Sequence, residues 1–428
     1  MTTDHTPGFG TLAIHAGAAP DPTTKARVTP IYQTTSFVFD DVDHAAALFG
    51  LQAFGNIYTR IGNPTNAVLE ERIAALEGGT AALAVASGHA AQVLAFQTLL
   101  APGDEFIAAR QLYGGSINQF NHAFKSFGWE VVWADVNDIG SFERAVSPRT
   151  KAIFIESIAN PGGVITDIEA ISKVAKRAGV PLIVDNTLAT PYLVRPFEHG
   201  ADIIIHSATK FLGGHGNSIG GLLVDGGRFN WLREGRYPFL SQPRPEYQGV
   251  VIGETFGNFA FAIAARVLGL RDLGPSLSPF NAFLILTGIE TLPLRMQRHA
   301  DNAQKVAEYL AAHPKVDWVS YAGLPGDRYH NLAKRYAPKG AGGVFTFGLS
   351  GGYEAGVAVV SNVKLFSHLA NIGDTRSLII HPASTTHRQL SDEQKVAAGA
   401  GPDVVRLSVG IEDVADIIAD LEQALSAA

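Results

Sequence analysis

Short apolar runs alternate with longer segments of helical spacing through the first two thirds of the chain. Seven of these runs have the length and composition of buried strands. They are Ala81–Ala86, Glu105–Ala109, Glu130–Ala134, Ala152–Glu156, Leu182–Val184, Ile203–His206 and Gly220–Val224. The segments between them with helical spacing include Ala90–Leu100, Gly115–Phe127 and Ile168–Ala178. Buried strands that alternate with helices predict an α/β fold with a mostly parallel sheet covered on both faces.

The two ends of the chain have a different pattern. Residues 1–60 show little regular periodicity, and we expect an arm that lies on another surface because it cannot bury a core of its own. A helix over Pro64–Leu76 follows, with Asn63 as its N-cap. We therefore predict three parts: an N-terminal arm (1–60), a ligand-binding α/β domain (61–265) and a smaller α+β domain (266–428).

The smaller domain begins with a long helical segment. Ser278–Leu310 is predicted to form one helix or a bent pair, with Pro293 as the kink. Four strands are expected, at Val316–Val319, Gly343–Leu349, Leu378–His381 and Val404–Ser408. Asp413–Leu425 reads as the last helix.

Composition excludes several classes of function. The net charge of −7 gives no electrostatic basis for binding nucleic acid or an anionic membrane. The chain has no cysteine, which excludes disulfides and thiolate chemistry and is compatible with the cytoplasm, where we expect the protein. No histidine and carboxylate pattern indicates a metal site, and neither a signal peptide nor a membrane span is visible.

Lys210 is the most informative residue. The apolar run Ile203–His206 leads into it, Ser207 and Thr209 precede it, and Gly213 and Gly214 follow. An amine beside apolar surface loses its proton more readily and can attack an aldehyde. Taken alone, a lysine after a strand is more often a solvated strand end.

Asp185 ends another apolar run, Leu182–Val184, upstream of the lysine. By itself such an aspartate is commonly a helix cap or a turn former. Together, a lysine for an imine and an aspartate for a pyridine nitrogen are the pair that pyridoxal phosphate needs from its protein. The sequence therefore predicts a pyridoxal phosphate site.

Other polar residues also follow predicted strand ends. They are Ser87, Tyr113 and Asn160. In a parallel sheet such ends meet at one edge, where ligands bind. Ser87, Gly88 and His89 open a helix and could cradle a phosphate, or Ser87 could be a plain N-cap. Tyr113 could stack on a flat ring, or be a surface turn residue.

Three further residues have two interpretations each. Tyr58 and Arg60 precede the first firm helix, where an arginine can bind phosphate or simply be solvated. Arg406 lies in an apolar strand, where an unpaired charge is costly. Its partner could be a substrate carboxylate or an internal Asp or Glu.

Five segments, in this order, resemble the Cys/Met-metabolism family of pyridoxal phosphate enzymes, and the match runs nearly end to end. They are Tyr58–Thr65, Ser87-Gly88, Val184–Thr187, Ser207–His215 and Arg406–Asp413. The resemblance implies the fold of the aspartate-aminotransferase-like transferases (fold type I). It also implies a homo-oligomer, at least a dimer and expected to be a tetramer built from dimers that share active sites.

The resemblance also implies roles for individual residues. Lys210 would join the cofactor and move protons, Asp185 would hold the ring nitrogen, and Tyr113 would stack on the ring. Residues expected around the phosphate are Ser87, Gly88, His89, Ser207 and Thr209, with Tyr58 and Arg60 from a neighbouring subunit. Residues expected at the substrate carboxylate are Arg406, Asn160 and Ser377.

The implied reaction is γ-replacement, in which O-acetyl-L-homoserine and sulfide give L-homocysteine and acetate, a step of methionine biosynthesis. Rival activities within the family use an O-succinyl ester, form cystathionine from cysteine, or cleave cystathionine as a γ-lyase. Lyases of the family that degrade methionine use a cysteine near the ring, and this chain has none. A rival of another class is a binding protein on the same scaffold.

Overall fold

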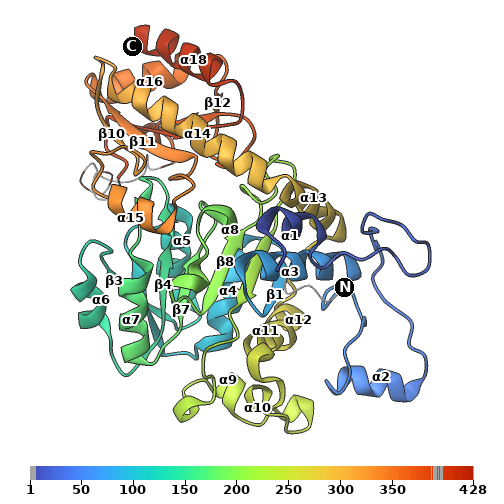
Figure 1. Ribbon diagram of the computed structural model, residues 1–428. Helices are drawn as coiled ribbons and strands as arrows, with labels where there is room; N and C mark the ends of the chain where they lie inside the picture. Colours follow the sequence, from blue (N-terminus) through green and yellow to red (C-terminus); the bar gives the residue numbers. More distant parts are fainter. Residues whose placement is uncertain (1–5, 387, 389–392, 394, 396–398, 428) are drawn as a thin grey trace.

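A seven-stranded sheet forms the centre of the protein in a computed structural model that describes residues 6–386, 388, 393, 395 and 399–427 (Figure 1). Its spatial order is β1 (Ala81–Val85), β9 (Gly221–Asp225), β8 (Ile203–Ser207), β7 (Leu182–Asp185), β4 (Thr150–Glu156), β2 (Glu105–Ala109) and β3 (Glu130–Ala134). All pairs from β8 to β3 are parallel, and β9 alone runs against its neighbours. The prediction of a mostly parallel sheet is confirmed.

Helices cover both faces of this sheet, so that every residue of β2 and β9 is buried. The helices of this domain are α3 (Pro64–Glu77), α4 (Gly88–Leu99), α5 (Gly114–Asn118), α6 (Ile139–Ala145), α7 (Ile168–Ala178), α8 (Thr190–Leu193), α9 (Pro238–Ser241), α10 (Ile252–Phe256), α11 (Ala260–Ala264) and α12 (Arg271–Leu273). Segment 115–127, predicted as one helix, is α5 followed by a π-helical stretch, Gln119–Phe124. A small hairpin, β5 (Ile158–Ala159) and β6 (Val164–Ile165), was not predicted.

The two helices that position the site begin and end as their sequences indicate. In α3, Asn63 accepts the Thr65 N–H at 2.9 Å, and Gly78 ends the helix at φ 76°. In α4, Ser87 Oγ accepts the Ala90 N–H at 3.1 Å. A side-chain cap of this kind satisfies one of the N–H groups that a helix leaves unpaired.

The C-terminal part forms a second, five-stranded sheet with helices α13 (Pro279–Glu290), α14 (Leu292–Ala311), α15 (His330–Tyr336), α16 (Gly352–Asn362) and α18 (Val414–Ser426). Its strand order is β10 (Val316–Ser320), β11 (Val344–Leu349), β14 (Val404–Ser408), β13 (Leu378–Ile380) and β12 (Ser367–His368). Segment 278–310 is a pair of helices that breaks at Thr291. Pro293 lies in the first turn of α14, where a proline costs no hydrogen bond.

The N-terminal arm contains two short helices that its pattern did not predict, α1 (Phe9–His15) and α2 (Val42–Phe49). Helix α2 stands away from the body of the molecule (Figure 1). Large apolar side chains of this arm face solvent, with Val38 97% and Val42 83% exposed. Within the described part of the chain, no helix has the length and apolar character needed to cross a bilayer.

Candidate active site

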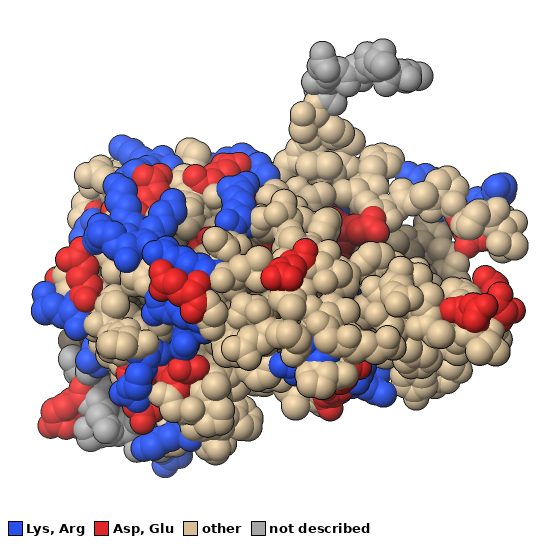
Figure 2. Space-filling view, turned by 90° about the horizontal axis from the view of Figure 1, so that it is seen from below, with Lys and Arg blue, Asp and Glu red and all other residues tan. Residues whose placement is uncertain are grey.

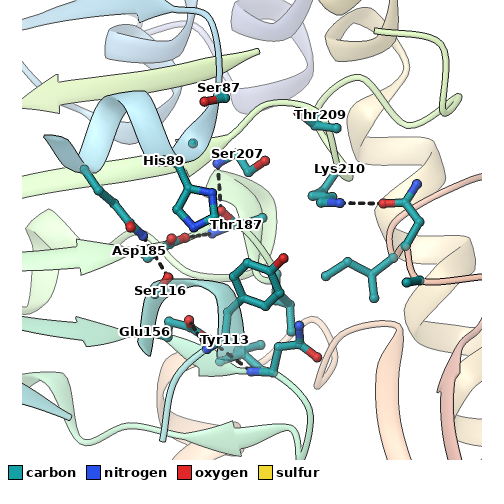
Figure 3. Close-up of a pocket in the computed structure, with 18 of the residues that line it drawn as sticks. Ser87, His89, Tyr113, Ser116, Glu156, Asp185, Thr187, Ser207, Thr209 and Lys210 are labelled. Atoms are coloured by element: carbon teal, nitrogen blue, oxygen red, sulfur yellow. Dashed lines mark hydrogen bonds between the residues drawn. The ribbon is translucent and has the colours of Figure 1, made fainter. Parts of the chain in front are cut away.

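A pocket of about 190 Å³ opens at the carboxyl ends of the parallel strands. Ten residues singled out from the sequence line it: Ser87, Gly88, His89, Tyr113, Asn160, Asp185, Ser207, Thr209, Lys210 and Arg406. Figure 3 shows seven of them, labelled, around a single space. All of them except Arg406 lie at the ends of five strands or in the segments that follow, because parallel strands bring their ends to one edge.

Lys210 follows β8 and reaches into the pocket from the turn after it (Figure 3). Its Nζ donates to Asn371 Oδ1 at 2.5 Å. Burial and the nearby Arg406 guanidinium lower the pKa of the Lys210 amine. The neutral, nucleophilic form of the amine is therefore more accessible than in a free lysine.

Asp185 is the last residue of β7, and its carboxylate faces the pocket. Its Oδ1 accepts the Thr187 N–H at 3.0 Å. Burial raises the pKa of Asp185, and no cation forms an ion pair with it among the described residues. A desolvated carboxylate without a cationic partner, aimed into a cavity, suits a ligand N–H that can carry positive charge.

Glu156 lies beside Asp185 on β4, paired with it in register. Its two carboxylate oxygens accept the backbone N–H groups of Tyr113, at 2.6 Å, and Asn160, at 3.1 Å. Burial and the charge of Asp185 raise the pKa of Glu156 well above its usual value. The residue thus holds the loops that carry Tyr113 and Asn160 at the mouth of the pocket.

A tight anion cradle lies where α4 begins. A Cβ added to Gly88 would come within 2.8 Å of Ser207 Cβ, so only glycine allows this approach. The first N–H groups of a helix have no partner within it and favour a bound anion. Ser87, Ser207 and Thr209 also line this end of the pocket and offer hydroxyl groups. A phosphate suits this donor set.

An aromatic wall closes one side of the pocket. Tyr113 is 48% exposed, and its ring lies 6.0 Å from the His89 ring, centroid to centroid. Figure 3 shows both rings in the part of the pocket near Asp185. A flat heterocycle would find a stacking surface here.

Arg406 projects from β14 of the C-terminal sheet into the same pocket. It donates to Asn160 Oδ1 and to the Asn371 carbonyl, both at 3.1 Å. No Asp or Glu forms a salt bridge with it within the described residues, which leaves its charge uncompensated by the protein. Burial lowers the pKa of Arg406 to about 10. A ligand carboxylate would supply the missing charge.

Three of the residues named from the sequence lie outside this pocket. Tyr58 and Arg60 sit on the exposed loop before α3, with the Arg60 guanidinium 5.5 Å from the Tyr58 ring centroid. Ser377 is fully buried, and its hydroxyl donates to Glu412 at 2.9 Å. The structure therefore does not bring Ser377 to the pocket formed by this chain.

The pocket also contains residues that the sequence did not single out as site residues. They include Gln92, Ser116, Glu156, Thr187, Ile219 and Asn371. The sequence could have indicated Glu156 and Thr187 as site residues, because Glu156 ends a predicted strand and Thr187 follows shortly after the end of another. Asn371 carries no local signal, since it lies 161 residues from Lys210 in the chain.

These residues fit one kind of cofactor: an amine for an aldehyde, an acid for a ring nitrogen, an aromatic wall and a phosphate cradle define a pyridoxal phosphate enzyme. The chain belongs to the family of Cys/Met metabolism PLP-dependent enzymes, whose family model matches residues 10–426. Pyridoxal phosphate is thus its cofactor, and the predicted fold class is confirmed.

Individual relatives cover nearly the whole chain. An O-acetyl-L-homoserine sulfhydrylase of Leptospira meyeri is 53% identical over 97% of this chain and 96% of its own length. O-acetyl-L-homoserine sulfhydrylase 1 of Thermus thermophilus is 52% identical over 98% of this chain and 100% of its own length. A crystal structure of a Campylobacter jejuni protein described as an O-acetylhomoserine (thiol)-lyase, with a pyridoxyl-lysine phosphate, superposes with a TM-score of 0.95 at 42% identity, over 98% of this chain and 100% of that one.

Proposed function

We propose that this enzyme carries out γ-replacement on O-acetyl-L-homoserine, with sulfide as the nucleophile, to give L-homocysteine and acetate. The observation that carries the proposal is one pocket that holds Lys210, Asp185 and Arg406 together, in a chain about half identical to sulfhydrylases of that substrate. The pocket is small, and it offers a cation for one carboxylate.

Some residues of the pocket bind the cofactor and others bind the substrate. Asp185 would hold the cofactor ring nitrogen, Tyr113 would stack on the ring, and Lys210 would bind the aldehyde. The phosphate would be held by Ser87, Gly88, His89, Ser207 and Thr209. When bound, pyridoxal phosphate supplies an electron sink for the carbon atoms of the substrate.

The reaction then depends on proton movement and orientation. Arg406, with Asn160, fixes the substrate carboxylate and so aims Cα at Lys210. Once the substrate amine has replaced it at the aldehyde, the free Lys210 Nζ would take a proton from Cα, pass that proton to the cofactor, and then take one from Cβ. Acetate leaves from Cγ, sulfide forms a bond to the same carbon, and Lys210 returns the protons. Burial and the charge of Arg406, which lower the pKa of Lys210, favour its action as a base at neutral pH.

A panel of substrates tests this assignment. With sulfide, O-acetyl-L-homoserine should give a kcat/KM at least about tenfold above that of O-succinyl-L-homoserine. Arg406 pairs with the α-carboxylate that the two esters share, and no second arginine among the described residues lines the pocket for the extra carboxylate of the succinyl ester. Cysteine in place of sulfide tests for cystathionine formation, and cystathionine alone tests for γ-lyase activity by release of ammonia and 2-oxobutanoate. A preference for the succinyl ester, or ammonia release without a thiol, would contradict the proposal.

Arg406→Lys should separate binding from chemistry. Lysine keeps the positive charge but cannot bind a carboxylate through two parallel N–H groups, so the KM for O-acetyl-L-homoserine should rise by about tenfold to a hundredfold. The kcat should change by no more than about threefold, because Lys210 and Asp185 are untouched. Steady-state kinetics and the cofactor Kd check this together. A large loss of kcat at an unchanged KM would assign Arg406 another role.

Tyr58 and Arg60 belong, in this proposal, to the active site of a neighbouring subunit of a homotetramer, built from dimers, in the cytoplasm. The proposal is supported by their exposed position outside this chain's pocket and by the exposed apolar side chains of the arm. Figure 2 shows a broad face on which Lys and Arg gather at one end while most other side chains are uncharged. Multi-angle light scattering of the purified protein checks the tetramer.

A further inference from the structure

A cluster of polar side chains lies buried behind the pocket. Glu77, Asn186 and His206 have no exposed surface, and Ser157 is 1% exposed. Glu77 Oε1 contacts His206 Nε2 at 2.6 Å and accepts the Asn186 side-chain N–H at 2.9 Å. Asn186 Oδ1 in turn accepts the Ser157 hydroxyl at 2.7 Å. One carboxylate, at the end of α3, thus joins His206 near the end of β8 to Asn186, which follows β7, and through Asn186 to Ser157, which follows β4.

Each of these three side chains is adjacent in sequence to a residue of the pocket. Ser157 follows Glu156, Asn186 follows Asp185, and His206 precedes Ser207. The strands concerned, β4, β7 and β8, are consecutive in the sheet. Because successive residues of a strand point to opposite faces, a tether on one face fixes the position of the neighbour on the other.

Stability alone does not account for this network. Replacing a buried ion pair by apolar side chains is often neutral or stabilising, and the same strands are otherwise apolar, as at Ile183, Val184 and Ile205. Two atoms of the pair, Glu77 Oε2 and His206 Nδ1, have no hydrogen-bond partner among the described residues. A network with unsatisfied atoms costs free energy of folding, so its benefit lies elsewhere.

The electrostatic surroundings of Asp185 also favour a role of the network in cofactor binding. Burial raises the pKa of Asp185, and the hydrogen bonds from Thr187, followed by the nearby His206, act against this rise. The carboxylate form of Asp185 is the one that can pair with a protonated ring nitrogen.

We infer that Glu77, with His206, Asn186 and Ser157, is a positioning network that holds Asp185 and its neighbours Glu156 and Ser207 in place for the cofactor ring. None of the four lines the cofactor pocket. Ser157, Asn186 and His206 act through the pocket residues beside them, and Glu77 acts through Asn186 and His206. The inference rests on the proposed placement of the ring at Asp185, and not on which ester or thiol the enzyme uses.

Glu77→Gln tests the network because it keeps the shape of the side chain and removes its charge. We expect the Kd of the apoprotein for pyridoxal phosphate to rise about tenfold, the effect of weakening one charge-assisted hydrogen bond. The visible circular dichroism band of the bound cofactor should weaken, since that signal reports how the ring is oriented. Absorbance titration and circular dichroism measure the two effects without a turnover assay.

Asp420→Asn is the matched control. Asp420 is also a buried carboxylate, 6% exposed, and it accepts three backbone N–H groups, those of Lys364, Leu365 and Phe366. It lies on α18, at the far end of the C-terminal domain (Figure 1). This variant should lower the thermal midpoint and leave both the cofactor Kd and the dichroism band unchanged.

The outcomes are distinct. If Glu77→Gln lowers the thermal midpoint but keeps the wild-type Kd and dichroism band, the network serves stability alone and the inference is wrong. If Glu77→Gln does not fold, Ser157→Ala removes the outer hydroxyl of the network, which donates to Asn186 Oδ1 at 2.7 Å and to the Asp185 carbonyl at 3.5 Å. This variant should raise the Kd about threefold, and an unchanged Kd there overturns the inference. An unchanged Kd in Asp185→Asn would instead overturn the placement of the ring.

Discussion

Replacing Lys210 with alanine should lower kcat/KM for sulfide-dependent homocysteine formation by about a thousandfold or more, because one amine both binds the cofactor aldehyde and moves the protons. The purified variant should also lack the visible absorbance of a covalently bound cofactor. The structural basis is direct: Nζ lies in the pocket against Asn371, and burial and Arg406 lower the pKa of the amine.

Two further variants make this result specific. Lys210→Arg keeps a positive charge but cannot lose its proton at accessible pH, so it should be as inactive as the alanine variant. Lys339→Ala is the matched control, since burial also lowers the pKa of Lys339, yet its Nζ lies 4.3 Å from the Tyr192 ring centroid, outside the pocket. It should keep wild-type turnover. Homocysteine formation by Lys210→Ala at more than about a tenth of the wild-type rate would contradict the assignment.

The sequence was sufficient to predict that several site residues lie close together, because this follows from the parallel order of the strands. Ser87, Tyr113, Asn160, Asp185 and Lys210 each follow a predicted strand, and parallel strands end at one edge. The apolar runs were long and regular enough to place β2, β3 and β14 at their observed bounds. Local pattern was therefore sufficient wherever one strand or one turn decides the position of a side chain.

Contacts between distant segments could not be predicted in this way. Asn371 meets Lys210 only because the C-terminal domain closes the pocket, and no local pattern marks it. Ser377, assigned to the substrate carboxylate by resemblance, is held by Glu412 in this chain. Segment 119–124 is π-helical where Phe120 and Phe124 pack into an aromatic cluster with Phe96, which is a tertiary effect on an otherwise helical pattern.

Asp185→Asn should weaken pyridoxal phosphate binding by about tenfold to a hundredfold, the free energy of a hydrogen bond to a charged group. The turnover of the loaded variant should also fall by roughly a hundredfold or more, because an amide cannot keep the ring nitrogen protonated. Titration of the apoprotein with the cofactor, followed by absorbance, measures the first effect, and steady-state kinetics the second.

The pH dependence of binding separates the charge of Asp185 from its shape. Burial raises the pKa of Asp185 above its usual value of 3.8 in the cofactor-free pocket. The ionised form pairs with the ring nitrogen, so cofactor affinity is fully present above that raised pKa and is lost as the pH falls through it. The asparagine variant has no such group, and its affinity should change less over the same range.

Asp225→Asn provides the control for burial alone. Burial raises the pKa of Asp225 to about 7, and its oxygens accept the Gly227 and Ala262 N–H groups at 2.8 and 3.2 Å. Because β9 runs against its neighbours, Asp225 lies at the edge of the sheet away from the pocket. Its variant should keep the wild-type cofactor Kd and its pH dependence. Equal losses of affinity in both variants would show that any buried strand-end carboxylate suffices, and the pairing of Asp185 with the ring nitrogen would be wrong.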